Sequence, residues 1–249
     1  MSPVALVTGS GAPRIGNIVV RDLASRGYAV VVHANRSLDK ARQTVEELTT
    51  AGQVAIALAA DVSQEGEVKQ LFARTLAEFG RIDVLVNTSA IWEGKKLEET
   101  TADDVRRHFE INAIGTFLCC QQAGMQMVKQ EGGGVIINVG DWAIARPYPD
   151  YAAYFPSKGA IPAMTRSFAV ELAARNPRIR VNAILPGPVM LPENMTAEER
   201  ERTINATLLR RAGQPENMAS AVRFLIENDF ITGVCLPVDG GRSVAGGAD

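Results

Sequence analysis

Residues 4–16 decide the expected fold, and they read VALVTGSGAPRIG. The apolar run Val4–Val7 leads into a turn of small residues, and an amphipathic helical pattern follows the turn. A strand, a glycine turn and a helix in this order bring backbone N–H groups to a pyrophosphate at the positive end of a helix. The alternative is a plain connection between a strand and a helix. The stretch predicts a dinucleotide site at Thr8, Gly9, Ser10, Arg14, Ile15 and Gly16.

Six further apolar runs follow, and helical patterns separate them. The runs are nearly continuous rather than alternating in polarity, which is typical of parallel strands covered on both faces. With 249 residues, 46% of them hydrophobic, the chain can bury one sizeable core. The sequence predicts an α/β chain, a doubly wound Rossmann fold with a seven-stranded parallel sheet, as a single domain over 1–249 with a substrate lid at about 187–212. The later strands are expected at 28–33, 54–60, 82–86, 135–139, 179–184 and 234–238.

Composition argues against several classes of partner. A formal net charge of -2 gives no electrostatic footprint for nucleic acid or for an anionic membrane. No apolar run reaches the ~18 residues that a spanning helix needs, and no targeting segment is recognisable, so we expect a cytoplasmic protein. Three cysteines and two histidines, all without ligand-like spacing, predict no metal site. A small molecule is the expected substrate.

Polar or turn-forming residues follow most of the predicted strands at the point where each strand ends. In a doubly wound sheet, ligands bind outside the carboxyl ends of the strands, near the switch in strand order. The placements therefore predict one ligand site at that edge. Beyond the glycine turn, its members are Arg36, Asp61, Asn87, Asp141 and the pair Pro186-Gly187.

Arg36 stands where a dinucleotide fold usually places a carboxylate for the ribose hydroxyls of NAD, about 20 residues after the glycine turn. A guanidinium beside the Ser37 hydroxyl suits a 2′-phosphate, through bidentate charge-assisted hydrogen bonds. The alternative is a solvated arginine at a strand end. The sequence predicts NADPH/NADP+ as the cofactor.

Asp141, Tyr154 and Lys158 supply a carboxylate, a phenol and an ammonium within eighteen residues. A phenol with a reference pKa of ~10 transfers protons poorly near neutral pH unless a nearby cation stabilises its ionised form. Positions i and i+4 share one face of a helix, so Lys158 can be that cation for Tyr154. The triplet predicts a proton-transfer site.

The chain resembles the short-chain dehydrogenase/reductases from Val4 to about Arg242. The resemblance implies that Tyr154 is the general acid, that Lys158 binds the nicotinamide ribose and lowers the pKa of the tyrosine, and that Asn112 anchors a proton-relay water. It also implies a homotetramer formed through long helices at about 103–130 and 151–174. Implied cofactor contacts are Tyr154 and Lys158 themselves, Asp61 with the Val62 backbone at the adenine, and Asn87, Pro186, Gly187 and Val189.

Asp141 departs from the pattern of that family, whose members mostly carry a serine at this position. An ionised carboxylate repels a developing oxyanion, and it favours a substrate with N–H donors. Together with Arg14 in the glycine loop and Trp92 after the fourth strand, Asp141 makes the chain similar to the pteridine reductase and dihydromonapterin (dihydrofolate-type) reductase branch. That similarity implies substrate contacts by Arg14, Trp92, Asp141 and Tyr154, with Trp92 stacked on the pterin ring. The alternative for Trp92 is packing under a loop.

The predicted function is hydride transfer from NADPH to a pteridine-like substrate, a dihydropterin or dihydrofolate. Two alternatives stay open. The nearer is an NADPH-dependent carbonyl reductase for a 3-oxoacyl or sugar ketone, in which Asp141 is protonated and donates a hydrogen bond. The other is a catalytically silent NADPH-binding sensor, although Tyr154 and Lys158 would have no purpose in it.

Overall fold

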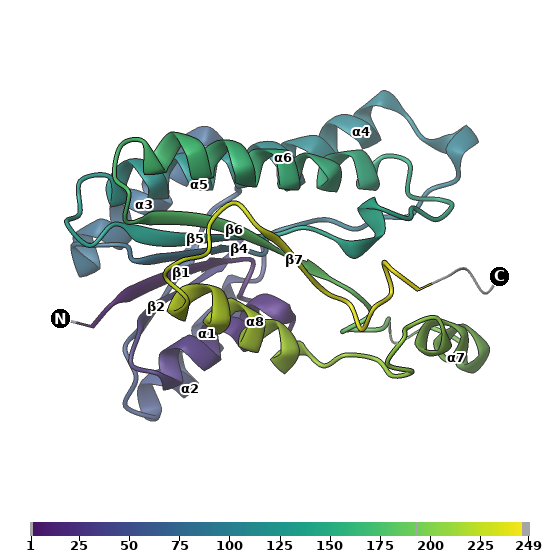
Figure 1. The fold of residues 1–249 in the computed structure, drawn as a ribbon. Helices are drawn as coiled ribbons and strands as arrows, with labels where there is room; N and C mark the ends of the chain where they lie inside the picture. The colour runs from purple at the N-terminus through teal and green to yellow at the C-terminus, as the bar shows by residue number, and fades with distance from the viewer. Residues whose placement is uncertain (1, 193, 246–249) are drawn as a thin grey trace.

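A computed structural model describes residues 2–192 and 194–245 of the chain. Its seven strands form one sheet in the order β3-β2-β1-β4-β5-β6-β7, and every neighbouring pair is parallel. This confirms the predicted seven-stranded doubly wound fold (Figure 1). The strands are β1 (Val4–Thr8), β2 (Ala29–Ala34), β3 (Ala55–Ala59), β4 (Val84–Asn87), β5 (Gly134–Val139), β6 (Ile179–Pro186) and β7 (Cys235–Val238).

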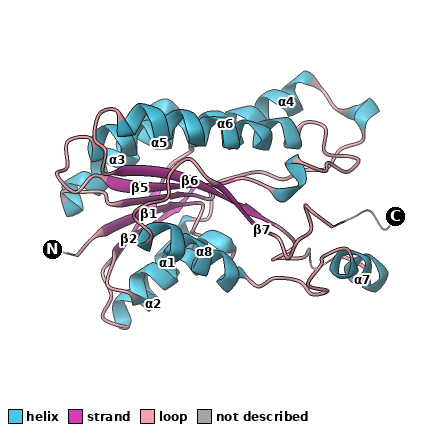
Figure 2. Cartoon of the chain, in the orientation of Figure 1, coloured by secondary structure: helices cyan, strands magenta, loops and turns pink. Residues whose placement is uncertain are grey.

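Helices cover both faces of the sheet, as Figure 2 shows. One face carries α1 (Ile15–Ser25), α2 (Leu38–Thr50) and α8 (Pro215–Glu227), and the other carries α3 (Glu65–Phe79), α4 (Ala102–His108), α5 (Gly115–Met127) and α6 (Tyr154–Ala173). Because each central strand is covered twice, its side chains are buried whichever way they point, which explains the unbroken apolar runs. Helix α7 (Ala197–Asn205) lies apart, beyond the carboxyl ends of the strands (Figure 1).

The strand order reverses next to β1. From β1 the chain builds outward through β2 and β3, then returns to place β4 on the other side of β1. Thr8 and Asn87, the last residues of β1 and β4, are register partners across this switch point. A crevice for ligands is expected there in such a sheet. The residues predicted from strand ends therefore lie along one edge.

The helix expected at 103–130 is interrupted. A π-helical segment, Phe109–Ile114, separates α4 from α5, which ends at Met127. Such segments insert an extra residue into a turn and occur often at functional sites. Here the segment contains Asn112, whose side chain is bonded to the backbone of Ile91. Sequence periodicity did not predict the interruption, since its cause is a contact with another segment.

Helix α6 begins at Tyr154 rather than near 151. Pro156 lies in its first turn, where the missing N–H has no helical partner to lose. Pro162, in contrast, lies inside the helix. The start at Tyr154 puts the phenol at the end of α6 that faces the carboxyl edge of the sheet.

Candidate active site

The glycine loop is fixed by a buried histidine. The Gly9 N–H donates to Nδ1 of His33 at 3.0 Å, and His33 Nε2 donates to the carbonyl of Ala60 at 3.0 Å. Gly9 has φ +68°, and a Cβ there would stand 2.9 Å from Cα of Ser89. Only glycine therefore suits this close approach. The loop after β1 is held against β2, the end of β3 and the loop after β4.

Two predicted cofactor residues of this loop use their side chains within the protein. Ser10 is fully buried, and its hydroxyl donates to the carbonyl of Val7 at 2.7 Å and accepts from the His33 N–H at 3.0 Å. Thr8 Oγ1 accepts from the backbone N–H groups of Thr88 and Ser89 at 3.1 and 3.2 Å. A hydroxyl bonded this way has little left for a ligand. The side chains of Thr8 and Ser10 therefore hold the loop in shape, and a cofactor contact at these two residues stays a prediction.

The start of α1 is suited to an anion. Arg14 is exposed at the N-cap, Ile15 and Gly16 open the helix, and the first turn carries no acidic residue. The first N–H groups of a helix have no intrahelical partner, and the helix dipole adds partial positive charge. The exposed Arg36 and half-buried Ser37 follow β2 along the same edge. This set of donors suits a dinucleotide that carries an additional phosphate.

Asp61 and Val62 lie where β3 ends. Burial raises the pKa of Asp61, but hydrogen bonds from Ser63 and Asn35 and the charge of Arg36 outweigh it, so the net effect lowers the pKa. Both the Ser63 N–H and hydroxyl donate to Asp61 Oδ1, at 2.9 and 2.7 Å. Val62 is buried in the core beside it. An adenine contact at Asp61 and the Val62 backbone stays a prediction.

Tyr154 and Asp141 form a direct pair. The Tyr154 hydroxyl donates to Asp141 Oδ2 at 2.7 Å, and the Ala143 N–H donates to Asp141 Oδ1 at 2.8 Å. Burial raises the pKa of Asp141, only partly offset by these bonds and by the charge of Lys158. The site therefore contains a buried carboxyl that holds its proton more tightly than an exposed one does.

Lys158 does not bond to the phenol in this structure. Lys158 Nζ donates to the carbonyl of Val139 at 2.8 Å, and burial lowers the pKa of the lysine to about 8, partly offset by the charge of Asp141. The pKa of Tyr154 is raised, first by burial and then by the charge and hydrogen bond of Asp141. An ionised Asp141 therefore disfavours the phenolate, and the lowering of the phenol's pKa by Lys158 stays a prediction.

Asn112 is fully buried and its amide is fully engaged. Its Oδ1 accepts from the Ile91 N–H at 2.9 Å, and its Nδ2 donates to the Ile91 carbonyl and to Ser157 Oγ, both at 3.0 Å. Ser157 in turn donates to the carbonyl of Tyr154 at 2.6 Å. Asn112 thus connects the loop after β4 to the first turn of α6. Sequence reasoning missed Ser157, because no motif marks a serine at that position.

Asn87 is also buried. Its Nδ2 donates to Asn138 Oδ1 at 2.9 Å, whereas its Oδ1 has no partner among the described residues. A buried acceptor without a partner is costly, and its position at the end of β4 would let a ligand donor satisfy it. After β6, the Gly187 N–H donates to Val238 at 3.0 Å and the N–H of the buried Val189 donates to Gly187 at 2.8 Å. Pro186 ends the strand at the same edge.

Trp92 stacks on a protein ring rather than standing alone. Its ring centroid lies 5.1 Å from that of Tyr151 with an interplanar angle of 10°, and the residue is 45% exposed. Tyr151 also makes an edge contact with Tyr154, with centroids 6.2 Å apart. One face of Trp92 is thereby covered by Tyr151, which agrees with the alternative of packing, and Tyr151 lies between Trp92 and Tyr154 in this chain of ring contacts.

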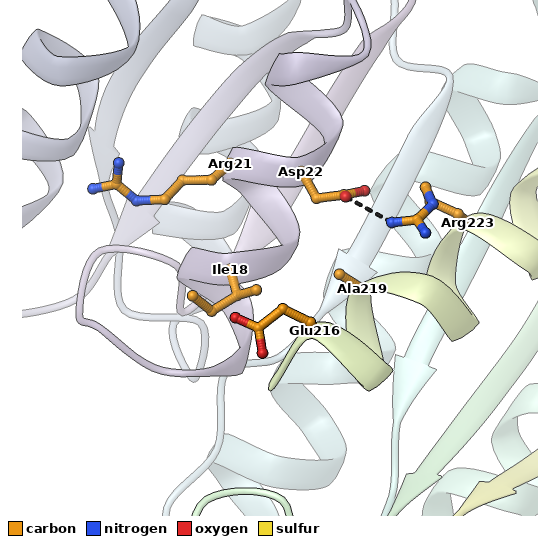
Figure 3. A pocket seen from close by; sticks show the side chains of 6 residues that line it. All are labelled: Ile18, Arg21, Asp22, Glu216, Ala219 and Arg223. Atoms are coloured by element: carbon orange, nitrogen blue, oxygen red, sulfur yellow. Dashed lines mark hydrogen bonds and ion pairs between the residues drawn. The ribbon is translucent and has the colours of Figure 1, made fainter. Parts of the chain in front are cut away.

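A surface cavity between α1 and α8 lies away from the predicted site residues. It has a volume of about 450 Å³. Figure 3 shows Arg223 reaching across from α8 to Asp22 on α1, with 2.6 Å between their charged atoms. None of the predicted site residues lines this cavity. Its ion pair serves to join the two helices that cover one face of the sheet.

His33 should make stability depend on pH. Burial lowers the pKa of His33 to about 4 from its ordinary 6.5, although its bond to Ala60 and the charge of Asp61 oppose the shift. The unfolded chain takes up the proton first, so stability is complete above pH 6.5 and falls as the pH drops towards 4, by about 3 kcal/mol in all. Denaturant unfolding at pH 7 and pH 4.5 measures this loss. His33→Gln should reduce the difference, and an equal difference in both proteins would contradict the assignment.

No helix in the described part of the chain is long and apolar enough to cross a membrane. Within the same residues, no group of histidine, cysteine or acidic side chains is placed to hold a metal ion.

The model of the family described as enoyl-(acyl carrier protein) reductase matches residues 11–243. A 3-oxoacyl-[acyl-carrier-protein] reductase of Synechocystis is 37% identical, covering 96% of each chain, and carbonyl reductase family member 4 of Xenopus laevis is 36% identical, covering 97% of this chain and 98% of its own. The crystal structure of acetoin dehydrogenase from Enterobacter cloacae has a TM-score of 0.89 and 34% identity, and the match covers 100% of this chain and 98% of that one. This protein is therefore an oxidoreductase that belongs to the short-chain dehydrogenase/reductase family, whose members use NAD(P)(H).

Proposed function

We propose that this protein is an NADPH-dependent carbonyl reductase that converts a ketone into an alcohol. The names of the relatives support a carbonyl substrate, since they include a 3-oxoacyl reductase and a carbonyl reductase. The observation that carries the mechanism is the 2.7 Å bond between the Tyr154 hydroxyl and Asp141 Oδ2 in a partly buried setting. Carbonyl reduction needs one proton for each hydride, and this pair can provide it.

A phenol beside an ionised carboxylate is a poor acid, because both anions would then stand together. A protonated Asp141 removes this difficulty, and burial favours that form by raising its pKa. In its protonated form Asp141 donates to the phenol oxygen across the same 2.7 Å contact, so that, as Tyr154 gives its proton to the carbonyl oxygen, Asp141 passes its own proton to Tyr154. The carboxylate left behind is stabilised by the Ala143 N–H and by the charge of Lys158.

The remaining site residues bind and orient. A bound NADPH supplies the hydride. The glycine loop and the first turn of α1 would hold its pyrophosphate, Arg36 and Ser37 the 2′-phosphate, and Asp61 with the Val62 backbone the adenine. Lys158 would hold the nicotinamide ribose, and Asn112 would keep Tyr154 in place through Ser157. Pro186, Gly187 and Val189, at the carboxyl end of β6, are proposed as further cofactor contacts.

A pterin substrate is the second candidate. It is favoured by the carboxyl group of Asp141, which can accept N–H bonds when ionised, and by the partly exposed Trp92 ring, which is stacked on Tyr151. The raised pKa of Asp141 and the names of the relatives favour a ketone instead.

A substrate panel followed by NADPH absorbance tests the proposal. The panel contains a 3-oxoacyl thioester, a small diketone, a dihydropterin and dihydrofolate, each with NADPH and with NADH. We expect turnover of at least one ketone at a kcat/KM far above that of the pterins. Turnover of pterins alone would restore the pteridine reductase. Tight NADPH binding without any turnover would indicate the silent sensor.

Arg36→Ala should reverse much of the preference for NADPH. A hydrogen bond to a charged group contributes about 1.5–3 kcal/mol, so we expect KM for NADPH to rise roughly 10- to 100-fold while KM for NADH changes little. Steady-state kinetics with both cofactors measure the split. Arg74→Gln, an exposed arginine on α3, is the control. Equal changes for both cofactors would show that Arg36 does not contact the 2′-phosphate.

The segment 187–212, which includes α7, is proposed as a lid over the substrate within one domain, because it follows β6 at the carboxyl edge. A homotetramer is proposed as the working assembly. Apolar side chains exposed along α5 and α6 support it, since such surfaces are usually covered in an assembly. They are Phe117, Met125 and Val170.

A further inference from the structure

The segment after β7 reaches the catalytic pair through an aromatic ring. Trp142 directly follows Asp141, opens the short helix Trp142–Ile144 and packs against the cluster formed by Ala143, Tyr154 and Phe155. The guanidinium carbon of Arg242 lies 5.1 Å from the centre of the Trp142 ring. One hundred residues apart in sequence, Arg242 and Trp142 are therefore stacked at the border of the proposed active site.

A second arginine lies on the same border. Arg146 follows the short helix, and its Nη1 donates to the carbonyl of Ala245, while Nη1 of Arg242 donates to the carbonyl of Thr203 at 3.5 Å. These carbonyls orient the two guanidinium groups but do not neutralise them. Each group has five N–H donors, so most remain available.

These arginines lack the acidic partners that other arginines have. Across residues 2–192 and 194–245, nine arginines form ion pairs with a carboxylate, and neither Arg146 nor Arg242 is among them. Asp239, in the same segment as Arg242, is buried and accepts from the N–H groups of Gly241 and Ser243 at 2.9 and 2.7 Å. The Asp239 carboxylate therefore accepts backbone hydrogen bonds in this turn and forms no ion pair with Arg242 among the described residues.

Two guanidinium groups near each other repel unless an anion lies between them. After burial, the charge of Arg146 is the largest cause that lowers the pKa of Arg242. An anion offsets such repulsion through charge-assisted, often bidentate, hydrogen bonds. Arg242 is half-buried, which strengthens its attraction for an anion relative to open water, whereas Arg146 is exposed.

We propose that Arg146 and Arg242 bind an anionic group of the ketone substrate, a carboxylate or a phosphate ester, with Trp142 holding Arg242 in position. The proposal rests on the proposed carbonyl reductase function and names its substrate class. The arginines follow β5 and β7, whereas Arg36 and the glycine loop follow β2 and β1 on the other side of the sheet. This placement assigns the anionic group to the substrate rather than to the cofactor phosphates.

Two matched pairs of ketones test the proposal. The first is 4-oxopentanoate and its neutral methyl ester, and the second is hydroxyacetone phosphate and free hydroxyacetone. With the wild-type protein and NADPH, at least one anion should have a kcat/KM about tenfold or more above its neutral partner. The pair that shows the preference distinguishes a carboxylate from a phosphate. Added salt should reduce the preference.

Arg146→Gln and Arg242→Gln keep a polar side chain but remove the charge. Each should raise KM for the preferred anion about tenfold, leave its kcat within about twofold, and leave the neutral ketone unchanged. Arg74→Gln is the matched control, and thermal unfolding checks that each variant is folded. Equal kcat/KM for anion and neutral partner in the wild type, or equal losses for both in the variants, would overturn the proposal.

Calorimetry distinguishes failure of the proposed anion site from failure of the proposed carbonyl reductase function. If no ketone of the substrate panel or of either pair is reduced, the proposed carbonyl reductase fails. Titration of 4-oxopentanoate and hydroxyacetone phosphate into the protein with NADP+ then still decides the anion site. Binding that Arg242→Gln weakens about tenfold supports the site. Binding that is absent, or unchanged in the variant, rejects it.

Discussion

Tyr154→Phe is expected to lower kcat for ketone reduction by about 10²–10⁴-fold, the usual contribution of a positioned proton donor. The ring stays in the cluster with Phe155 and Ala143, and only the hydroxyl that bonds to Asp141 is lost. Affinity for NADPH should change little. Single-turnover kinetics measure the first effect, and fluorescence titration of the cofactor measures the second.

Tyr151→Phe is the matched control for this experiment. Tyr151 belongs to the same group of rings, but it forms no hydrogen bond with Asp141. Its variant should keep near wild-type kcat. If Tyr154→Phe retained full activity, or if both variants lost the same amount, the phenol of Tyr154 would not be the proton donor.

Asp141→Ala is expected to lower kcat/KM by about 10²–10³-fold, the loss typical of removing one donor to a developing oxyanion. The loss has two causes here, since the proton reserve for Tyr154 disappears together with the hydrogen bond. Asp141→Asn should lose less, because an amide can still accept from Tyr154 and donate to a carbonyl oxygen. Steady-state kinetics of both variants with the best ketone of the panel measure the difference.

Because Asp141 can be protonated or ionised, we expect kcat/KM for ketone reduction to depend on pH. Burial raises the pKa of Asp141, and the proposed working form is the protonated one. The kcat/KM for reduction should therefore be highest at low pH and fall as the pH rises through that raised pKa. Asp141→Asn cannot ionise, so this limb of the profile should vanish. An unchanged limb in the Asn variant would assign the titration to another group, and faster pterin reduction at high pH would support an ionised Asp141.

Most of the architecture could be predicted because its signals are local. The glycine turn of residues 4–16 and the apolar runs gave the parallel sheet, and strand ends placed Arg36, Asp61 and Asp141 at one edge. The structure confirms this sheet. The interruption around Asn112 could not be foreseen, because it accompanies hydrogen bonds to Ile91, which comes from a different loop.

The types of residue at the site did not by themselves determine the substrate class. From the sequence, an ionised Asp141 favours a substrate with N–H donors, and a protonated Asp141 with a ketone substrate is the alternative. The structure buries it and raises its pKa, while the phenol of Tyr154 bonds to it rather than to Lys158. The names of the relatives then favour a carbonyl substrate, which the sequence had left as the alternative.

By itself, the sequence determined the fold class, the order of the site residues along the sheet edge and the chemical groups available there. These depend on local patterns of polarity and on turn residues, which act over a few positions. Only the tertiary structure decided that burial raises the pKa of Asp141, that His33 fixes Gly9, and that Arg242 stands over Trp142. Burial and charge at a site are set by side chains from distant segments, and their distances exist only once the chain has folded.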